Sequence, residues 1–260
     1  MGQQPPLSSP PADAVGPQPP AQAPPSQAWL VETRHVWKRY GRVEAVRGID
    51  LRLAAGQIVG LVGPNGSGKS TLLKLIAGLL RPDSGEVRVL GRRPGTLTKA
   101  WVAFQPEIDH LYPWLSVERV MDLAASVAPD WEDERARELL RLLQLEPYLR
   151  TPVRALSRGM RARVKLAVTL ARTAPVVLLD EPLSGIDPPS RARVIRALIE
   201  QFRTGEQLVV LATHEVAETE GIFDRVVFLD RGQVRIDDDA QALRQRFGRS
   251  IQGIMEEVYG

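Results

Sequence analysis

Apolar and polar positions follow two different patterns along most of the chain, which predict strands and helices in turn. Alternation and short apolar runs predict strands at 29–38, 43–53, 57–62, 86–90, 176–179, 207–212 and 225–229. The range 43–53 is predicted to be a strand pair. Helical periodicity appears at 71–80, and the Leu-, Arg- and Glu-rich residues 116–150 have few β-branched side chains, which favours helices. This order is typical of an α/β fold around a mixed or parallel sheet, interrupted by a helical insert.

The two ends of the chain depart from this pattern. Nine of the 21 prolines lie within the first 25 residues, which hold a single charge, Asp13. Such a composition buries little apolar surface, so residues 1–27 are predicted to be a disordered or polyproline-like tail, with a docking peptide as the alternative. We place the main domain at 28–248, with its helical insert at about 106–165. An i, i+3, i+4, i+7 spacing predicts a short amphipathic helix within 249–260, formed by Ile251, Ile254, Met255 and Val258.

Composition excludes several classes of function. The chain has no cysteine, which rules out disulfides, zinc-cysteine sites and thiol nucleophiles. No apolar run approaches the roughly 18–20 residues of a membrane-spanning helix, and the N-terminus lacks the basic and apolar parts of a secretory signal. A net charge of +3 is weak support for a nucleic-acid partner. Only five of the 34 basic residues are Lys and the single Asn is Asn65, a bias that GC-rich codon usage explains better than heat adaptation.

A glycine-rich loop joins the strand at 57–62 to the helix at 71–80. It matches G-x-x-x-x-G-K-S and comprises Gly63, Pro64, Asn65, Gly66, Ser67, Gly68, Lys69 and Ser70. Glycines let the backbone curl so that its N–H groups point at phosphate oxygens, and the helix N-terminus adds partial positive charge. We expect Lys69 to reach the β- and γ-phosphates, Ser70 to bind Mg²⁺ and Thr71 to line the site. This P-loop predicts nucleotide binding.

Two adjacent carboxylates end the apolar strand at 176–179. Because α/β folds place ligands at the carboxyl ends of strands, Asp180 and Glu181 are candidate site residues. Asp180 suits Mg²⁺, through water, and Glu181 suits the polarisation of an attacking water molecule. Adjacent acids are also common in surface turns, but a P-loop about 110 residues upstream favours the functional interpretation.

Five further motifs stand in a fixed order around these two. They are Tyr40 before the P-loop, Gln105 in Phe-Gln-Pro, Leu156-Ser157-Arg158-Gly159-Met160, Leu183-Ser184-Gly185-Ile186-Asp187-Pro188, and His214 in Ala-Thr-His-Glu. Together with the P-loop and the acidic pair, this order resembles the ATP-binding subunits of ABC transporters over roughly residues 30–230. The resemblance implies an α/β P-loop NTPase of the ABC type, with an antiparallel β subdomain and a helical insert.

The resemblance also implies a role for each of these residues. Tyr40 would stack on adenine, for which an aromatic face needs no base-specific hydrogen bond. Gln105 would contact Mg²⁺ or the lytic water with its neutral carbonyl, and His214 would donate a hydrogen bond to the γ-phosphate. Glu181, His214, Gln105 and Lys69 are the implied catalytic residues, and Ser70, Gln105 and Asp180 the implied metal ligands. The implied cofactors are ATP and Mg²⁺.

The segment 156–160 corresponds to the family signature, usually LSGGQ, but departs from it at Arg158 and Met160. Ser157 suits the N-cap of a helix running to about residue 172, and a capped helix start is also an anion site. By resemblance, Ser157 and Gly159 would contact the nucleotide of a second subunit, with Asp187 near the junction. Similar signatures are familiar from ABC-2-type exporters, including YtrB-like subunits, and our hypothesis is that Arg158 tunes closure on ATP.

The resemblance defines the expected partners. They are a second ATP-binding subunit, in a homodimer or a heterodimer, and a transmembrane permease that meets the surface around Gln105 and the helical insert. The chain is then expected in the cytoplasm, peripheral on the inner face of the membrane, with no nucleic-acid partner. The alternative is an ABC-type ATPase that acts on ribosomes or nucleic acid. A small-molecule kinase would explain residues 63–70 but not the signature, residues 183–188 or His214.

The remaining conspicuous residues have ordinary interpretations. We expect His35 and His110 to be surface or turn residues, and both Trp101 and Trp114 to lie in the core. The acidic run 237–239 lacks the spacing of a calcium loop, so it is predicted to begin the next helix.

Overall fold

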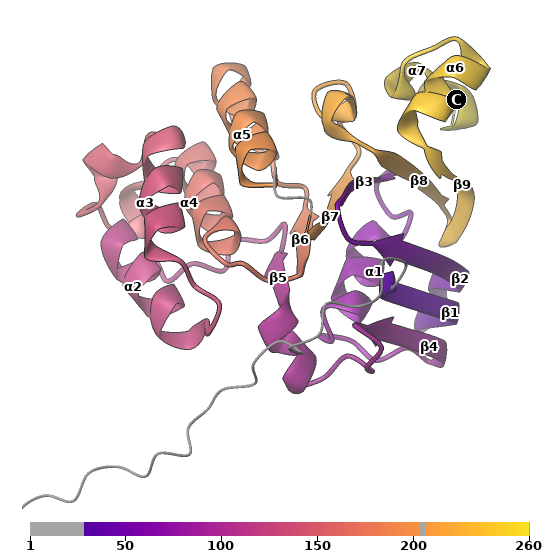
Figure 1. Ribbon diagram of the computed structural model, residues 1–260, viewed down its shortest axis with the longest axis horizontal. Helices are drawn as coiled ribbons and strands as arrows, with labels where there is room; N and C mark the ends of the chain where they lie inside the picture. Colours follow the sequence, from indigo (N-terminus) through magenta and orange to yellow (C-terminus); the bar gives the residue numbers. More distant parts are fainter. Residues whose placement is uncertain (1–28, 203–205, 260) are drawn as a thin grey trace, which may run out of the picture.

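A computed structural model describes residues 29–202 and 206–259, in which two sheets and a helical lobe are arranged side by side (Figure 1). The predicted tail 1–27 lies outside the described residues. The first sheet is antiparallel with the order β2-β1-β4, formed by β1 (Trp29–Tyr40), β2 (Val43–Ala54) and β4 (Ser84–Val89). The prediction of a strand pair within 43–53 was wrong, because this segment is one long strand that pairs with β1 along its length.

The second sheet has six strands in the order β5-β6-β7-β3-β8-β9, parallel except for β9. Its strands are β3 (Gln57–Val62), β5 (Val102–Gln105), β6 (Val176–Asp180), β7 (Leu208–Thr213), β8 (Arg225–Asp230) and β9 (Gln233–Asp239). Alternate residues of β6 face opposite sides: Val176 and Leu178 pack toward α1, and Val177 and Leu179 toward the helical lobe. The carboxyl ends of five parallel strands therefore meet at one edge.

Helix α1 (Lys69–Ile76) lies between the two sheets, and its apolar side chains belong to a core shared with both. The predicted range 71–80 was displaced, since the helix begins directly at the P-loop lysine and ends earlier. The helical lobe contains α2 (Val117–Val127), α3 (Asp133–Leu142) and α4 (Arg158–Leu170), and stands apart from the antiparallel sheet in Figure 1.

The remaining helices complete the chain. They are α5 (Pro188–Gln201), α6 (Ala240–Phe247) and α7 (Ile251–Tyr259), with 3-10 helices η1 (Leu97–Trp101), η2 (Glu146–Tyr148), η3 (Val153–Ala155) and η4 (Glu220–Ile222). In α7, Ile251 and Ile254 are buried, as the amphipathic pattern predicted. The acidic run was half predicted: Asp239 caps α6 by accepting from the Ala242 N–H at 2.8 Å, whereas Asp237 and Asp238 belong to β9.

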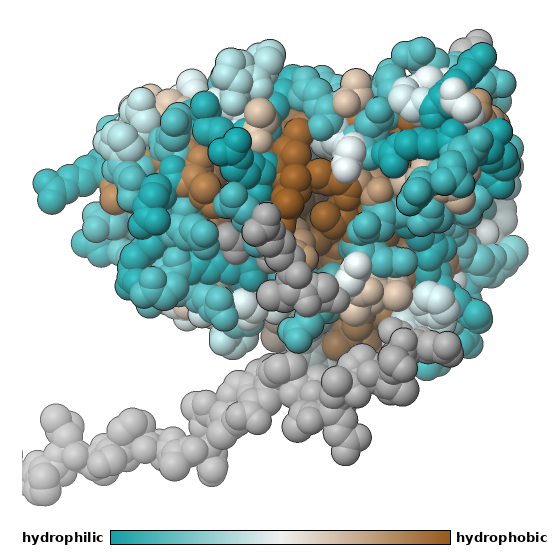
Figure 2. Space-filling view, turned by 45° about the horizontal axis from the view of Figure 1, so that its top comes forward, coloured by the Kyte–Doolittle hydropathy of each residue, from teal (hydrophilic) through white to brown (hydrophobic). Residues whose placement is uncertain are grey.

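The surface is divided between the helical lobe and the rest of the molecule, which forms a second lobe. Figure 2 shows mainly hydrophilic surface on both lobes and apolar side chains gathered in a hollow between them on this face. Within residues 29–202 and 206–259, no helix is long and apolar enough to cross a bilayer.

Candidate nucleotide site

The P-loop connects β3 to α1 and is held by backbone contacts that only glycine permits. A Cβ at Gly63 would lie 2.2 Å from the Leu229 carbonyl oxygen, and one at Gly68 would lie 2.2 Å from that of Ala45. Gly68 also has φ of +107°, in the region that favours glycine. The loop is therefore wedged between β2 and the end of β8, which fixes the curl of its backbone.

Lys69 is buried at the base of this loop. Its Nζ donates to the carbonyl oxygens of Gly63 at 2.7 Å and Pro64 at 3.2 Å, and lies 3.7 Å from Glu181 Oε1. Burial lowers the pKa of Lys69, while the charge of Glu181 opposes this shift. The ammonium group therefore lies against the loop, where it can contact an anion bound by the loop.

Ser70, Asp180 and Gln105 are the three residues expected to offer oxygen ligands to a metal ion. The Ser70 hydroxyl donates to Asp180 Oδ1 at 2.9 Å, and Gln105 ends β5 beside the strand β6 that ends at Asp180. Burial raises the pKa of Asp180, which the Ser70 hydrogen bond opposes. Gln105 Oε1 is buried and accepts no hydrogen bond from any residue that the structure describes. An unpaired buried carbonyl oxygen at the end of the strand that neighbours β6 suits a hard cation such as Mg²⁺.

Glu181 is held in an uncommon backbone conformation at the end of β6. Its φ is +48°, and its N–H donates to the Ala212 carbonyl at 2.9 Å. Its buried Oε1 lies 2.8 Å from His214 Nδ1; because a carboxylate only accepts, Nδ1 must carry the proton. The predicted partners Lys69, Glu181 and His214 therefore meet in one contact network, a meeting that the sequence did not predict in this form.

Tyr40 lies at the end of β1 with 48% of its surface exposed. Beside it, a pocket of about 600 Å³ is lined by Gly41, Val43 and Gly66 together with several arginines, so the β1–β2 turn borders the P-loop. The β8–β9 turn also contacts this loop: the Gly232 N–H donates to the Ser67 carbonyl at 2.9 Å. Sequence reasoning missed this support, although the turn sequence Asp230-Arg231-Gly232 was a signal for it.

The signature residues form a separate cluster. Ser157 caps α4 by accepting from the Met160 N–H at 3.2 Å, and Arg158 Nη2 donates to Ser184 Oγ at 3.2 Å. A Cβ at Gly159 would lie 2.9 Å from the Gly185 carbonyl oxygen, so helix and loop touch. Asp187 caps α5 by accepting from the Ser190 N–H at 3.1 Å, and hydrogen bonding from Ser190, its side chain first and its N–H second, lowers the Asp187 pKa.

The structure does not bring these signature residues to the chain's own P-loop. No hydrogen bond or ion pair within the described ranges joins Ser157, Gly159 or Asp187 to residues 63–71. Arg158 and Ser184 instead line a pocket together with Gln105 and Glu181, so the signature cluster borders the site without contacting the P-loop through hydrogen bonds.

The two tryptophans near Gln105 differ in burial. Trp101 is buried, as predicted, but the prediction for Trp114 was wrong, because 68% of its surface is exposed. It lies against Tyr112, with ring centroids 5.4 Å apart, and Ile108 is also exposed. His35 and His110 are exposed, as expected.

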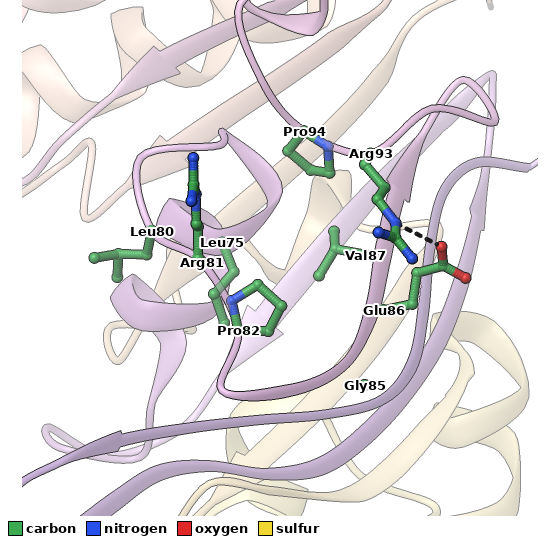
Figure 3. A pocket seen from close by; sticks show the side chains of 9 residues that line it. All are labelled: Leu75, Leu80, Arg81, Pro82, Gly85, Glu86, Val87, Arg93 and Pro94. Carbon is green, nitrogen blue, oxygen red and sulfur yellow. Dashed lines mark hydrogen bonds and ion pairs between the residues drawn. The ribbon is translucent and has the colours of Figure 1, made fainter.

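Another pocket, of about 430 Å³, lies on the antiparallel side of the molecule (Figure 3). Leu75 and Val87 line it, and the Arg93 guanidinium beside it donates to Glu86 at 3.1 Å. None of the predicted site residues lines this pocket, so it is separate from the nucleotide site.

Comparison with known proteins identifies the family. The family model described as "ABC transporter" matches residues 46–184, more than half of the 260 residues. This chain belongs to the ABC transporter family. It is an ABC-type ATPase, and its P-loop and two sheets, one antiparallel and one mixed, are those of ABC ATPase cassettes.

Several relatives are similar over most of this ABC cassette. The aliphatic sulfonates import ATP-binding protein SsuB of Zymomonas mobilis is 34% identical over 80% of this chain and 85% of that protein. An ABC transporter ATP-binding protein of Synechocystis is 33% identical over 80% of this chain and 62% of that protein. The mouse organic anion transporter ABCA8B is 32% identical over 79% of this chain, which spans only 13% of that relative's length.

Solved structures agree with the fold. An ATP-binding subunit of an ABC transporter superposes with a TM-score of 0.77 at 27% identity, covering 89% of this chain and all 100% of that one. The ADP- and phosphate-bound dimer of the cassette MJ0796 superposes with a TM-score of 0.72 at 25% identity, covering 80% and 98%.

Proposed function

We propose that this cassette is the ATP-hydrolysing subunit of an ABC transporter and powers a separate transmembrane permease through ATP-driven dimerisation. The observation that carries the proposal is the contact network of Lys69, Glu181 and His214 at the base of the P-loop. It joins a phosphate-binding lysine to a carboxylate whose side chain is already oriented. A small-molecule kinase would not account for the signature cluster that lies beside this network.

ATP binding in this proposal uses the loop and the β1–β2 turn. Residues 63–71 surround the phosphates, and Tyr40 stacks on adenine from the bordering pocket. Lys69 exchanges the carbonyl oxygens of Gly63 and Pro64 for phosphate oxygens, a small movement because it already lies at the loop's base. The burial that lowers its pKa also strengthens its attraction to an anion.

Hydrolysis depends on Glu181 as the group that orients and polarises water. His214 holds this carboxylate through Nδ1 and so fixes where the water is activated. With Nδ1 already donating, a second hydrogen bond from Nε2 to the γ-phosphate requires the imidazolium form. His214 thus links the charge state of the phosphate to the position of Glu181.

Mg²⁺ would be held by Ser70 and Gln105 directly and by Asp180 through water, and when bound it supplies positive charge against the phosphates. The unpaired Gln105 Oε1 supports this ligand set. Asp180, whose burial disfavours its charge, gains a counter-charge there.

The second subunit completes the site in this proposal. Ser157, Gly159 and Asp187 contact a nucleotide held by the partner cassette; within their own chain, Ser157 and Asp187 cap α4 and α5. The dimeric state of the similar MJ0796 cassette supports such an assembly. One set of motifs is compatible with two equivalent sites in a homodimer, and a degenerate partner would make a heterodimer.

The permease is proposed to dock on the exposed residues Ile108, Tyr112 and Trp114, close to Gln105. Export is the proposed direction, on the strength of the Ser-Arg-Gly-Met signature, although SsuB is named for import. Residues 28–248 form the ATPase domain, and the chain is proposed to lie in the cytoplasm, peripheral on the inner face of the membrane through its permease.

Co-expression with a candidate transmembrane permease tests this proposal. We expect the chain to co-purify with that protein, and Trp114→Ala to lose it while keeping the basal ATPase activity of the free chain. Tyr148→Ala, an exposed aromatic elsewhere on the helical lobe, is the matched control and should still co-purify. If the chain does not co-purify with the membrane protein and instead binds RNA or DNA in a salt-sensitive manner, the result would support the ribosome or nucleic-acid alternative.

A further inference from the structure

Lys165 is a buried lysine that joins α4 to the segment following Gln105. Its Nζ donates to three consecutive backbone carbonyls, those of Pro106 at 3.1 Å, Glu107 at 2.8 Å and Ile108 at 3.2 Å. Only 6% of the residue is exposed. It is one of five lysines against 29 arginines, so lysine at this position stands out against the composition.

The chemistry of the contact explains why lysine is suited to it. An ammonium group has three tetrahedrally arranged donors on one nitrogen, which three convergent carbonyls satisfy, whereas arginine spreads its donors in a plane over three nitrogens. No carboxylate of the described residues pairs with Lys165; the nearby Asp109 is engaged by Arg161 at 2.6 Å. Burial lowers the pKa of Lys165, and the carbonyl dipoles together with the charges of Asp109 and Glu107 favour its charged form. Its loss would therefore release the segment 106–108.

The segment it holds determines where Gln105 lies. β5 is an edge strand that pairs only with β6 within the described sheet, and Gln105 is its last residue. At the other end of β5, Arg172 donates to the carbonyls of Val102 at 2.9 Å and Ala100 at 3.0 Å. The α4 region thus anchors this short strand on both sides, and Lys165 is the anchor on the side of the unpaired Gln105 Oε1.

We propose that Lys165 is a positioning residue that holds Gln105 Oε1 toward the Mg²⁺–nucleotide and transmits the position of the signature helix to it. Lys165 lies about two helical turns from Ser157, at the start of the same helix. Movement of α4 against a second subunit would therefore move the segment 106–108 and, with it, the metal ligand. This inference rests on the proposed role of Gln105 and goes beyond it by naming what sets its position.

The test compares nucleotide affinity with and without the metal. Binding of the non-hydrolysable analogue AMP-PNP is measured by titration calorimetry in Mg²⁺ and in EDTA. The Kd in EDTA divided by the Kd in Mg²⁺ reports how much the metal tightens binding. Lys165→Met keeps the length of the side chain and removes the donors. We expect it to reduce this ratio about tenfold, the effect of losing an outer-shell contact to a metal ligand, while the Kd in EDTA stays unchanged. Gln105→Ala should reduce the ratio by at least as much.

Arg172→Met is the matched control, since it removes backbone contacts from the other side of β5. It should lower the Tm and leave the ratio unchanged. Lys165→Arg keeps the charge and serves if the methionine variant does not fold; it too should reduce the ratio, because planar donors spread over three nitrogens do not match carbonyls that converge on one nitrogen. A wild-type ratio in the folded Lys165 variant, or an equal reduction in Arg172→Met, overturns the inference.

The outcome for Gln105→Ala separates the two proposals. If that variant keeps the wild-type ratio, the metal role of Gln105 is refuted, and any effect of Lys165 then passes elsewhere, which also overturns the inference. If Gln105→Ala reduces the ratio and Lys165→Met does not, only the inference fails.

Discussion

Replacing Glu181 by glutamine separates ATP binding from hydrolysis. The amide can still accept the hydrogen bond from His214 Nδ1, now 2.8 Å from Oε1, so the local geometry is preserved. The carboxylate lies 3.7 Å from Lys69 Nζ, a pair worth about 4.5 kcal/mol of Coulomb attraction at an effective dielectric constant of about 20. Releasing even a third of this attraction to the γ-phosphate makes ATP binding about tenfold tighter.

The rate of ATP hydrolysis should fall, although ATP binding becomes tighter. Loss of a general base lowers the rate by about 10²–10⁴-fold, so Glu181→Gln should bind ATP, accumulate a dimer and release almost no phosphate. Phosphate release and size-exclusion chromatography with ATP measure the two effects. Glu215→Gln is the matched control, since this exposed acid next to His214 pairs with Arg191 at 3.1 Å and should change neither property. Undiminished phosphate release from Glu181→Gln would refute the assigned role.

Two further predictions concern stability. Burial raises the pKa of Asp180, so its carboxylate destabilises the metal-free fold at neutral pH; this cost is absent below the ordinary carboxyl pKa and grows as the pH rises through the raised value. Asp180→Asn should therefore raise the Tm in EDTA at neutral pH, with a smaller gain in acid, and equal gains at both pH values would contradict this reasoning. Tyr259→Phe removes a hydroxyl that donates to the Leu229 carbonyl at 3.0 Å, beside Gly63. It should cost about 1 kcal/mol and about 2–4 °C in Tm by calorimetry, whereas Tyr112→Phe, an exposed tyrosine, should leave the Tm unchanged.

The core motifs were predictable because their geometry is local. The P-loop lies between a strand and a helix that are its neighbours in sequence, so backbone curl and helix start follow from residues 57–76 alone. The acidic pair likewise follows from one buried strand. The signature serine was recognisable as an N-cap for the same reason, and it caps α4.

Predictions failed where pairing or exposure depends on distant residues. β5 has only four residues, too few for a clear pattern, and β9 is largely polar because it is an edge strand. Trp114 was expected in the core because it is large and apolar, yet no other segment that the structure describes covers the turn that carries it. Whether a side chain is buried depends on what packs over it, which a single segment does not contain.

The sequence by itself determined the identity and order of the chemical groups: a phosphate loop, two acids, a glutamine, a signature serine and a histidine. Tertiary structure decided how they contact one another. The bond between Glu181 and His214 joins residues 33 positions apart, and Lys165 reaches carbonyls 57–59 positions away. Such contacts depend on the order of strands in the sheet and on which helix covers which edge, and packing of the whole chain sets both.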